Sequence, residues 1–317
     1  MSTIKLPYIR HHLSAEKEGL VRLLSKPSDA QGIAAAVSVV VVYVAAGFLI
    51  LSLNVWFLQI LGFFGMSCAM IRGGFLVHEA SHHTLMKNRT WNNIFGVAFG
   101  IPIAMPMTMY GYFHRIHHAY ERTERDPGNL EHLAKKLHIH PTLLQWLILI
   151  GGTELSILQT ILTALLMIVR NKRRDILIEY SLVGLFFLSV FSLLTLTELI
   201  AVWVIPFLLA ATAMNVRIIA EHELPKSLES QFTRTRTVVS NRLVQWILYN
   251  GNFHLEHHLY PKVPAYNLPK LHQLLQEEFR TANSSIYSGY MAFMWDYCVA
   301  SWQRLLKSKT SNNRSAL

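Results

Sequence analysis

An almost uninterrupted apolar run from Ile33 to Ile71 restricts the fold of this chain more than any other feature. A helix crosses the hydrocarbon core of a bilayer with about 20 residues, so a run of nearly twice that length predicts two spans joined near Ser52–Asn54. Only 15% of the 317 residues are charged, against about 25% in soluble domains. We therefore predict an all-α integral membrane protein with four transmembrane helices, at residues 33–53, 56–77, 176–196 and 199–220.

Two further apolar segments are expected not to cross the membrane. Residues 92–110 are interrupted by Pro102 and Pro106, which favours a re-entrant or interfacial segment. Residues 142–169 contain Glu154, and a carboxylate near the bilayer centre costs about 2.5–3.5 kcal/mol on insertion scales. We interpret this second segment as a surface-lying or half-buried helix.

The positive charge predicts how the chain is oriented. Its net charge of +10 would suggest a nucleic-acid partner in a soluble protein. Here the turns near residues 52–55 and 196–198 contain no Lys or Arg, whereas RNKRR occupies 170–174. Because basic residues collect on the cytoplasmic side of membrane proteins, we expect a cytoplasmic histidine-rich cap and no bound nucleic acid. The N-terminal residues lack the apolar core of a signal peptide.

We expect a single domain over residues 1–317, with its core at about 35–275. Residues 1–30 form a polar arm, in which KEGLVRLLSK (17–26) is either a short amphipathic helix on the membrane surface or a frayed segment. From about residue 305 to 317 the chain is polar again, and the tract SKTSNNRS is expected to be disordered.

Three histidine clusters carry the chemical information in the chain. The first, in VHEASHH, holds His78 and His82 four residues apart; the others hold three histidines each, at i, i+3 and i+4. On a helix, this spacing places the imidazoles on one face. The clusters comprise His78 and His82, then His114, His117 and His118, and finally His254, His257 and His258, and His222 in AEHELP is a plausible ninth member.

So many imidazoles on one side of a membrane predict a metal centre. One ion takes about four to six ligands, so eight or nine histidines indicate two ions, and neutral imidazole suits zinc, copper or iron. The other histidines are interpreted as surface residues: His11, His12, His132, His138, His140 and His272.

In order and spacing, the clusters HEASHH, HRIHH and HLEHH resemble the three histidine boxes of the membrane fatty acid desaturase family. The resemblance covers about residues 35–275. It includes DPG at 126–128, RIIAEH at 217–222 and the string YNGNFHLEHHLYPKVPAYNLPKLH that ends at His272.

The resemblance implies a mushroom-shaped enzyme in which two non-haem irons activate O₂ to remove hydrogen from an unactivated C–H bond. It implies an acyl-lipid substrate that gains a double bond, and electrons from an external carrier such as ferredoxin or cytochrome b5. The implied ligands are His78, His82, His114, His117, His118, His222, His254, His257 and His258. His83, beside His82, is either a neighbour of the ligands or an alternative ligand.

The chain departs from the family pattern in two ways, since it has no HPGG-type haem motif and is short. We therefore favour a multi-pass protein of a bacterial cytoplasmic membrane, with the endoplasmic reticulum as the eukaryotic equivalent.

Carboxylates near the clusters are expected to orient ligand imidazoles by accepting their second N–H. Glu221 and Glu256 are the strongest candidates because ligands flank them, and Glu79 and Asp126 are open to the same interpretation or to that of surface charges. Asn252 either holds a metal-bound water or stabilises a loop.

Three other functions can be considered. HEASH fits the H-E-x-x-H motif of a zinc protease, with Glu79 as general base, but that reading leaves the other clusters unexplained. A metal transporter should bind its ion at the membrane midplane, whereas these histidines lie beyond helix ends. A di-iron hydroxylase or ketolase acting on a carotenoid or another lipid is the main alternative to a desaturase.

Overall fold

The computed structural model describes residues 13–171 and 173–314, and within them the chain is almost entirely helical. The long helices are α2 (Asp29–Ser52), α3 (Trp56–His82), α7 (Pro141–Asn171), α8 (Arg174–Leu193), α10 (Ile205–His222) and α16 (Tyr290–Arg314). The shorter elements are α1 (Ala15–Leu24), α4 (Arg89–Gly100), η1 (Ile101–Ile103), α5 (Met107–Tyr120), α6 (Leu130–Leu137), α9 (Leu196–Leu199), η2 (Ile200–Val204), α11 (Gln231–Arg234), α12 (Arg242–Ile247), α13 (His254–Leu259), η3 (Ala265–Asn267), α14 (Leu268–Leu274) and α15 (Gln276–Thr281). Strands β1 (Arg236–Val238) and β2 (Ser285–Tyr287) pair in parallel.

Each of the four predicted spans corresponds to a long apolar helix. They are α2, α3, α8 and the continuous Leu196–His222 stretch of α9, η2 and α10. Among the described residues, α7 is also long and apolar enough to cross a membrane, so length and composition give five candidates and leave the four-span count open. Helix α7 bends at Gly151, whose backbone is not helical (φ −138°, ψ 24°).

The segment with two prolines is sharply bent, which fits either the predicted re-entrant segment or one broken span. Helices α4–η1 and α5 meet at an angle of 100°. At the start of α5, the Glu179 carboxylate of α8 accepts hydrogen bonds from the backbone N–H of Thr108 (3.0 Å) and from its hydroxyl. A helix start needs acceptors for its free N–H groups, and Glu179 supplies one where water is scarce.

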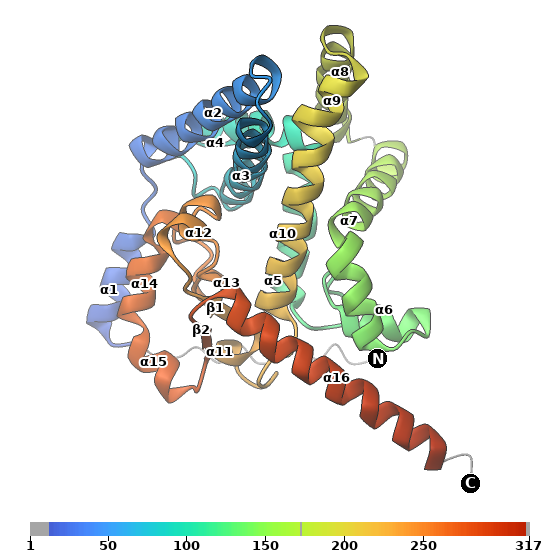
Figure 1. The fold of residues 1–317 in the computed structure, drawn as a ribbon. Coiled ribbons are helices and arrows are strands. Elements are labelled where there is room, and N and C mark those ends of the chain that lie inside the picture. Colours follow the sequence, from blue (N-terminus) through green and yellow to red (C-terminus); the bar gives the residue numbers. More distant parts are fainter. Residues whose placement is uncertain (1–12, 172, 315–317) are drawn as a thin grey trace.

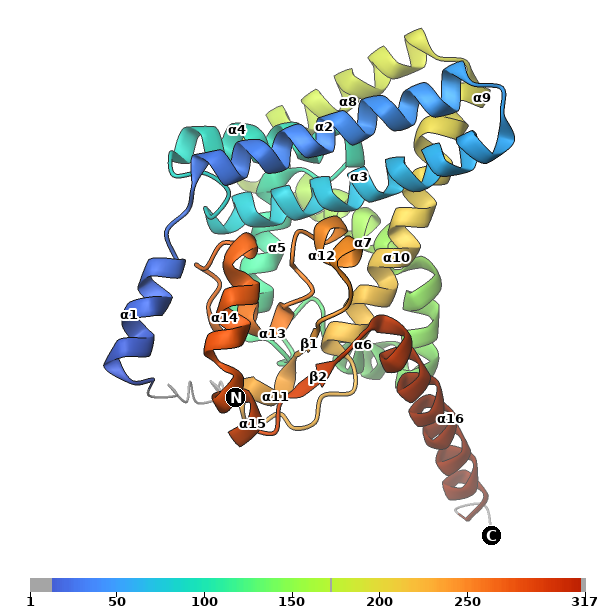
Figure 2. The same cartoon turned by 60° about the vertical axis from the view of Figure 1, so that its left-hand side comes forward.

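Helices α11 to α15 and the two strands gather at one end of the molecule, beside the ends of α3, α5 and α10 (Figures 1 and 2). Arg72 in α3 connects this region to the spans. Its guanidinium donates to Ser38 Oγ of α2 (2.9 Å) and to the carbonyl of Trp246 in α12, and it lies over the rings of Trp246 and Tyr249. One buried cation therefore joins two candidate spans to the region that follows β1.

The terminal segments differ in part from expectation. The predicted helix near residues 17–26 is present as α1, but it packs on the protein, with Lys17 Nζ 2.6 Å from a Glu278 carboxylate oxygen. The first twelve residues of the predicted arm, with His11 and His12, lie outside the described residues. At the other end, α16 continues through Arg314, so the expectation of a disordered tail is wrong for the part that is described.

Candidate metal centre

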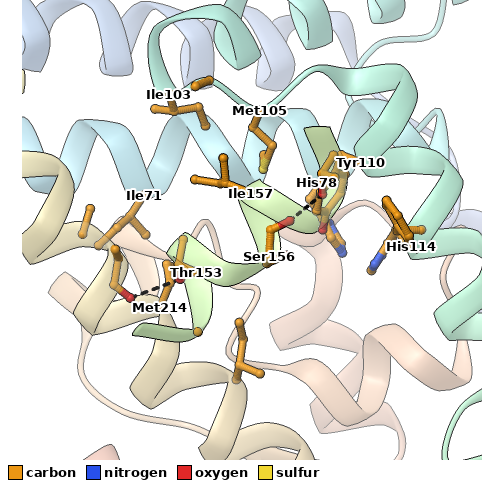
Figure 3. Close-up of a pocket in the computed structure, with 18 of the residues that line it drawn as sticks. Ile71, His78, Ile103, Met105, Tyr110, His114, Thr153, Ser156, Ile157 and Met214 are labelled. Atoms are coloured by element: carbon orange, nitrogen blue, oxygen red, sulfur yellow. Dashed lines mark hydrogen bonds between the residues drawn. The ribbon is translucent and has the colours of Figure 1, made fainter. Parts of the chain in front are cut away.

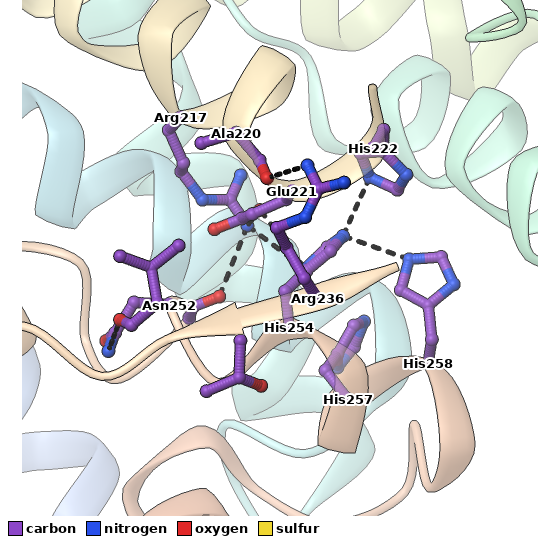
Figure 4. A network of polar contacts seen from close by, with 12 residues as sticks. Arg217, Ala220, Glu221, His222, Arg236, Asn252, His254, His257 and His258 are labelled. Atoms are coloured by element: carbon purple, nitrogen blue, oxygen red, sulfur yellow. Dashed lines mark hydrogen bonds and ion pairs between the residues drawn. The ribbon is translucent and has the colours of Figure 1, made fainter. Parts of the chain in front are cut away.

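Nine histidines from four helices meet at the end of the helix bundle. The last turns of α3 and α10 supply His78, His82 and His222, while α5 and α13 each supply three. The i, i+3 and i+4 spacing turns all three imidazoles of α13 to one side. Figure 4 shows His254 and His258 of α13 pointing toward His222.

The histidines form two groups. In the first, one ring nitrogen each from His78, His82, His114 and His257 lies within 4.8 Å of the others. His118 joins them, because its Nε2 is 3.1 Å from that of His114 and 3.0 Å from that of His257. We call these residues the five-histidine group.

The second group contains His117, His222 and His258, whose ring nitrogens also lie within 4.8 Å of one another. His254 completes it, with its Nε2 2.8 Å from that of His222 and 3.0 Å from that of His258. We call these residues the four-histidine group. The rings of His118 and His258 stack with centroids 4.4 Å apart, so the two groups adjoin.

This arrangement fits two metal ions better than a hydrogen-bonded network. Several Nε2 atoms converge on each other, and the buried Nε2 of His78 has no hydrogen-bond partner among the described residues. Burial, followed by neighbouring histidines, lowers the pKa of His254 and His257 well below the ordinary value, so both are neutral. Neutral imidazoles with converging nitrogens are ligands for zinc, copper or iron.

Carboxylates lie beside the opposite ring nitrogens, as expected for ligands held in one orientation. The Nδ1 atoms of His78, His117 and His254 lie near Glu79 (3.2 Å), Asp126 (2.9 Å) and Glu221 (3.4 Å), respectively. For these three carboxylates, the orienting role predicted from sequence is consistent with the contacts.

The sequence interpretation missed Glu121, whose carboxylate lies 3.4 Å from Nδ1 of His258. Burial acts to raise the pKa of Glu121, but His258, His117 and Arg122 outweigh it, leaving a pKa of about 2 and an ionised carboxylate. Its position three residues after His118 was the available signal.

Glu256, by contrast, was assigned wrongly. It contacts Nδ1 of His272 (2.5 Å) and the hydroxyl of Thr237, and so connects α13 to α14 and β1. His272 is accordingly a partner of Glu256 and not a simple surface residue.

His83, a candidate neighbour of the ligands or alternative ligand, lies apart from the other nine histidines. His83 ends α3 in the left-handed conformation (φ 60°), so the chain turns away directly after His82. Its ring lies 3.3 Å from both Arg89 and Asn92, outside both histidine groups. Asn252 stabilises a loop, since its side-chain amide donates to the carbonyls of Val238 (2.8 Å) and Val239 (3.0 Å).

Arg217 is a second residue whose place in the site the sequence did not reveal. Its guanidinium lies 2.6 Å from a Glu221 carboxylate oxygen and 3.2 Å from Nδ1 of His254, and stacks 4.7 Å from the ring centre of Phe75 (Figure 4). An arginine side chain can only donate hydrogen bonds, so Arg217 fixes the position of the Glu221 carboxylate, which then accepts from Nδ1–H of His254.

An apolar cavity of about 380 Å³ adjoins both histidine groups. Figure 3 shows His78 and His114 on one side of it, Ile71 and Met214 on the other, and Ile157 of α7 between them. His117, His222 and His254 also line it. The remaining walls come from α3, the bent segment before α5, α5 itself, α7 and α10, including Met70, Phe75, Ile103, Met105, Phe113, Phe207, Ala210 and Ala211. This cavity can hold an apolar chain against the histidines.

The fold and the site define a helical membrane protein in which two groups of histidines with the spacing of metal ligands lie beside an apolar cavity. The model of the fatty acid desaturase family matches residues 51–290. The chain belongs to this family.

Two relatives are similar at modest identity. The chain is 27% identical to the dihydrorhizobitoxine desaturase of Bradyrhizobium elkanii, over 64% of this chain and 63% of that protein. It is 25% identical to the Delta(5) fatty acid desaturase fat-4 of Caenorhabditis elegans, over 79% of this chain and 63% of that protein. The matches thus cover less than two thirds of either relative's length.

Proposed function

We propose that this protein is an O₂-dependent di-iron membrane desaturase that introduces a double bond into the fatty acyl chain of a lipid. The observation that carries the proposal is the apolar cavity lined by members of both histidine groups. When bound, two irons would supply the activation of O₂ needed to remove hydrogen from an unactivated C–H bond.

The chain's own residues position the substrate and the ligands. The five-histidine and four-histidine groups would each hold one iron. The cavity walls keep water from an acyl chain and place its C–H bonds beside His78 and His114. Tyr110 stacks on His114 with ring centres 5.2 Å apart and also lines the cavity, so it limits where the chain can lie.

The contacts of Glu79 disfavour a zinc protease. One oxygen of this carboxylate accepts from the backbone N–H of Ala265 (2.8 Å) and from Thr84 (2.8 Å), while the other faces His78. The Glu79 carboxylate therefore links α3 to the segment before α14. Both of its oxygens are occupied, so it cannot act as the base that activates a water.

The function is tested by lipid and carotenoid profiling of a host that expresses the gene. We expect a new unsaturated acyl chain, and no such product from a His114→Ala variant expressed at the same level. A hydroxylated lipid or a modified carotenoid in place of the alkene would instead establish the hydroxylase or ketolase alternative.

For the topology, we propose four spans with both termini and the histidine groups in the cytoplasm. Helix α7 does not cross in this arrangement. Its acidic Glu154 and the bend at Gly151 support that assignment. We favour the cytoplasmic membrane of a bacterium, or the endoplasmic reticulum in a eukaryote.

The topology predicts where reporter tags are found. Tags after residue 2 and at residue 317 should both report the cytoplasm, and a tag between Leu196 and Leu199 should report the opposite side. A probe at Lys172 should react from the cytoplasm, and labelling from outside would mean that α7 crosses the membrane.

We propose that electrons come from an acidic carrier such as ferredoxin or cytochrome b5, steered by basic residues near the histidine groups. Arg115, Arg125 and Lys262 are exposed, and Lys262 Nζ lies 3.0 Å from the carbonyl of His82. Arg234 and Arg236 are also basic, but they are buried and donate to backbone carbonyls, so they cannot contact a carrier.

Donor-dependent turnover should fall as ionic strength rises, because salt screens the attraction between exposed charges. Arg125→Gln should weaken this dependence. Arg173→Gln is the matched control, since Arg173 is half-buried and already paired with Asp175. A rate that stays constant from low to high salt would contradict steering.

A further inference from the structure

Helix α16 packs against the rest of the protein with only one face. On this face Phe293, Tyr297 and Ser301 are buried, and the ring of Tyr297 lies 5.6 Å from that of Trp146 in α7. Phe293 and Tyr297 belong to a core cluster with Ile219 and Ala220 of α10. The start of α16 is thus fixed beside the four-histidine group.

The opposite side of α16 carries large apolar side chains in solvent. Met291, Trp295 and Trp302 are 84%, 73% and 65% exposed, and Val299 is also exposed. Their spacing of four, four and three residues places them in one stripe along the helix. In ideal helical geometry this stripe lies roughly opposite the buried face. We call Met291, Trp295, Val299 and Trp302 the α16 stripe.

The positive charge of α16 is concentrated in the C-terminal part of its sequence. After Asp296 the sequence contains no further acidic residue, whereas Arg304, Lys307, Lys309 and Arg314 follow. Two copies of this helix lying side by side would bring like charges together. An anionic surface would instead attract this end of the chain.

The position of α16 is compatible with a lipid surface. It leaves the body beside the His222 end of α10, which closes a candidate span, and extends obliquely to α10 in both views (Figures 1 and 2). Tryptophan is the side chain that prefers the boundary between head groups and acyl chains, and the stripe contains two.

We propose that α16 is a membrane-surface anchor. The α16 stripe enters the boundary between head groups and acyl chains of an anionic leaflet, and the exposed Arg304 contacts the lipid phosphates. Amphipathic helices of this kind sit about 5–10 Å into that boundary. The proposal concerns how the protein contacts the bilayer and does not depend on the reaction that it catalyses.

The test uses spin labels on the full-length protein in vesicles that contain phosphatidylglycerol. Cys298 is exposed and is first replaced by serine, whereas Cys68 is buried. Single cysteines are then placed at Trp295, at Trp302 and, as the matched control, at the exposed polar Gln303 next in sequence. Collisions with dissolved oxygen report lipid, and collisions with a water-soluble nickel complex report water.

Labels at 295 and 302 should collide with the nickel complex several-fold less often than the label at 303, and more often with oxygen. In phosphatidylcholine vesicles without anionic lipid, this difference should shrink at 302. Equal nickel accessibility at all three positions would overturn the proposal. So would spin–spin coupling between labels at 295 that persists when the protein is diluted with lipid, since a second copy would then cover the stripe.

Discussion

Replacing His257 by alanine should remove bound iron and abolish desaturation. His257 lies in the five-histidine group, with its Nε2 3.0 Å from that of His118, and it is buried, so no described side chain can take its place. Loss of a residue that only orients a ligand typically costs about 10–100-fold in affinity or activity, and we expect the loss of the ligand itself to exceed that range. Iron per chain and lipid product are measured on the same sample.

Two variants of neighbouring residues serve as controls. His83→Ala should keep its iron, because His83 faces Arg89 and Asn92. Glu79→Gln should lose about 10–100-fold as an orienting residue. A single zinc per chain, with activity lost in Glu79→Gln but kept in His257→Ala, would contradict the desaturase assignment and support a protease.

Gly251→Ala should be strongly damaging, although it adds only one methyl group. A Cβ at Gly251 would overlap the ring of Phe75, which backs the Arg217 guanidinium and lies near His78. Overpacking costs about 1–3 kcal/mol and occasionally more, and here the displaced ring would move Arg217 away from Glu221. We expect a lower thermal midpoint in detergent and reduced iron content.

The ring overlap can be separated from a general intolerance of alanine. Gly184→Ala in α8 is the matched control, because its Cβ would meet nothing within 4 Å, and it should unfold no earlier than the parent protein. Phe75→Leu combined with Gly251→Ala should recover part of the iron. If the double variant were no better than Gly251→Ala alone, the overlap with Phe75 would not be the cause.

The sequence was sufficient for features that depend on periodicity along one element. The apolar runs placed α2, α3, α8 and α10, and the i, i+3, i+4 histidines identified the faces of α5 and α13, because both patterns are local. The bend near Pro102 followed from two prolines, which interrupt a helix wherever it packs.

Features that depend on contacts between distant elements could not be predicted. Glu256 and Glu121 both lie beside histidines in sequence, and only the packing of α14 and α5 against α13 decides that the first contacts His272 and the second His258. His83 follows the histidine pattern, but the chain reverses at that residue. The apolar composition of α7 does not decide whether it crosses the membrane, because an apolar helix can face lipid or line a cavity.

The contacts of Arg72 have a consequence for exchanging parts between relatives. Its hydrogen-bond donors come from α3, but their acceptors lie in α2 and α12, on either side of it in sequence. A chimera that grafts residues 242–250 from another desaturase onto these spans would still offer a backbone carbonyl at position 246. The guanidinium would, however, lose its two aromatic faces unless Trp and Tyr stood at positions 246 and 249. We therefore expect chimeras that exchange α2, α3 and α12 together to fold better than chimeras that exchange α12 alone.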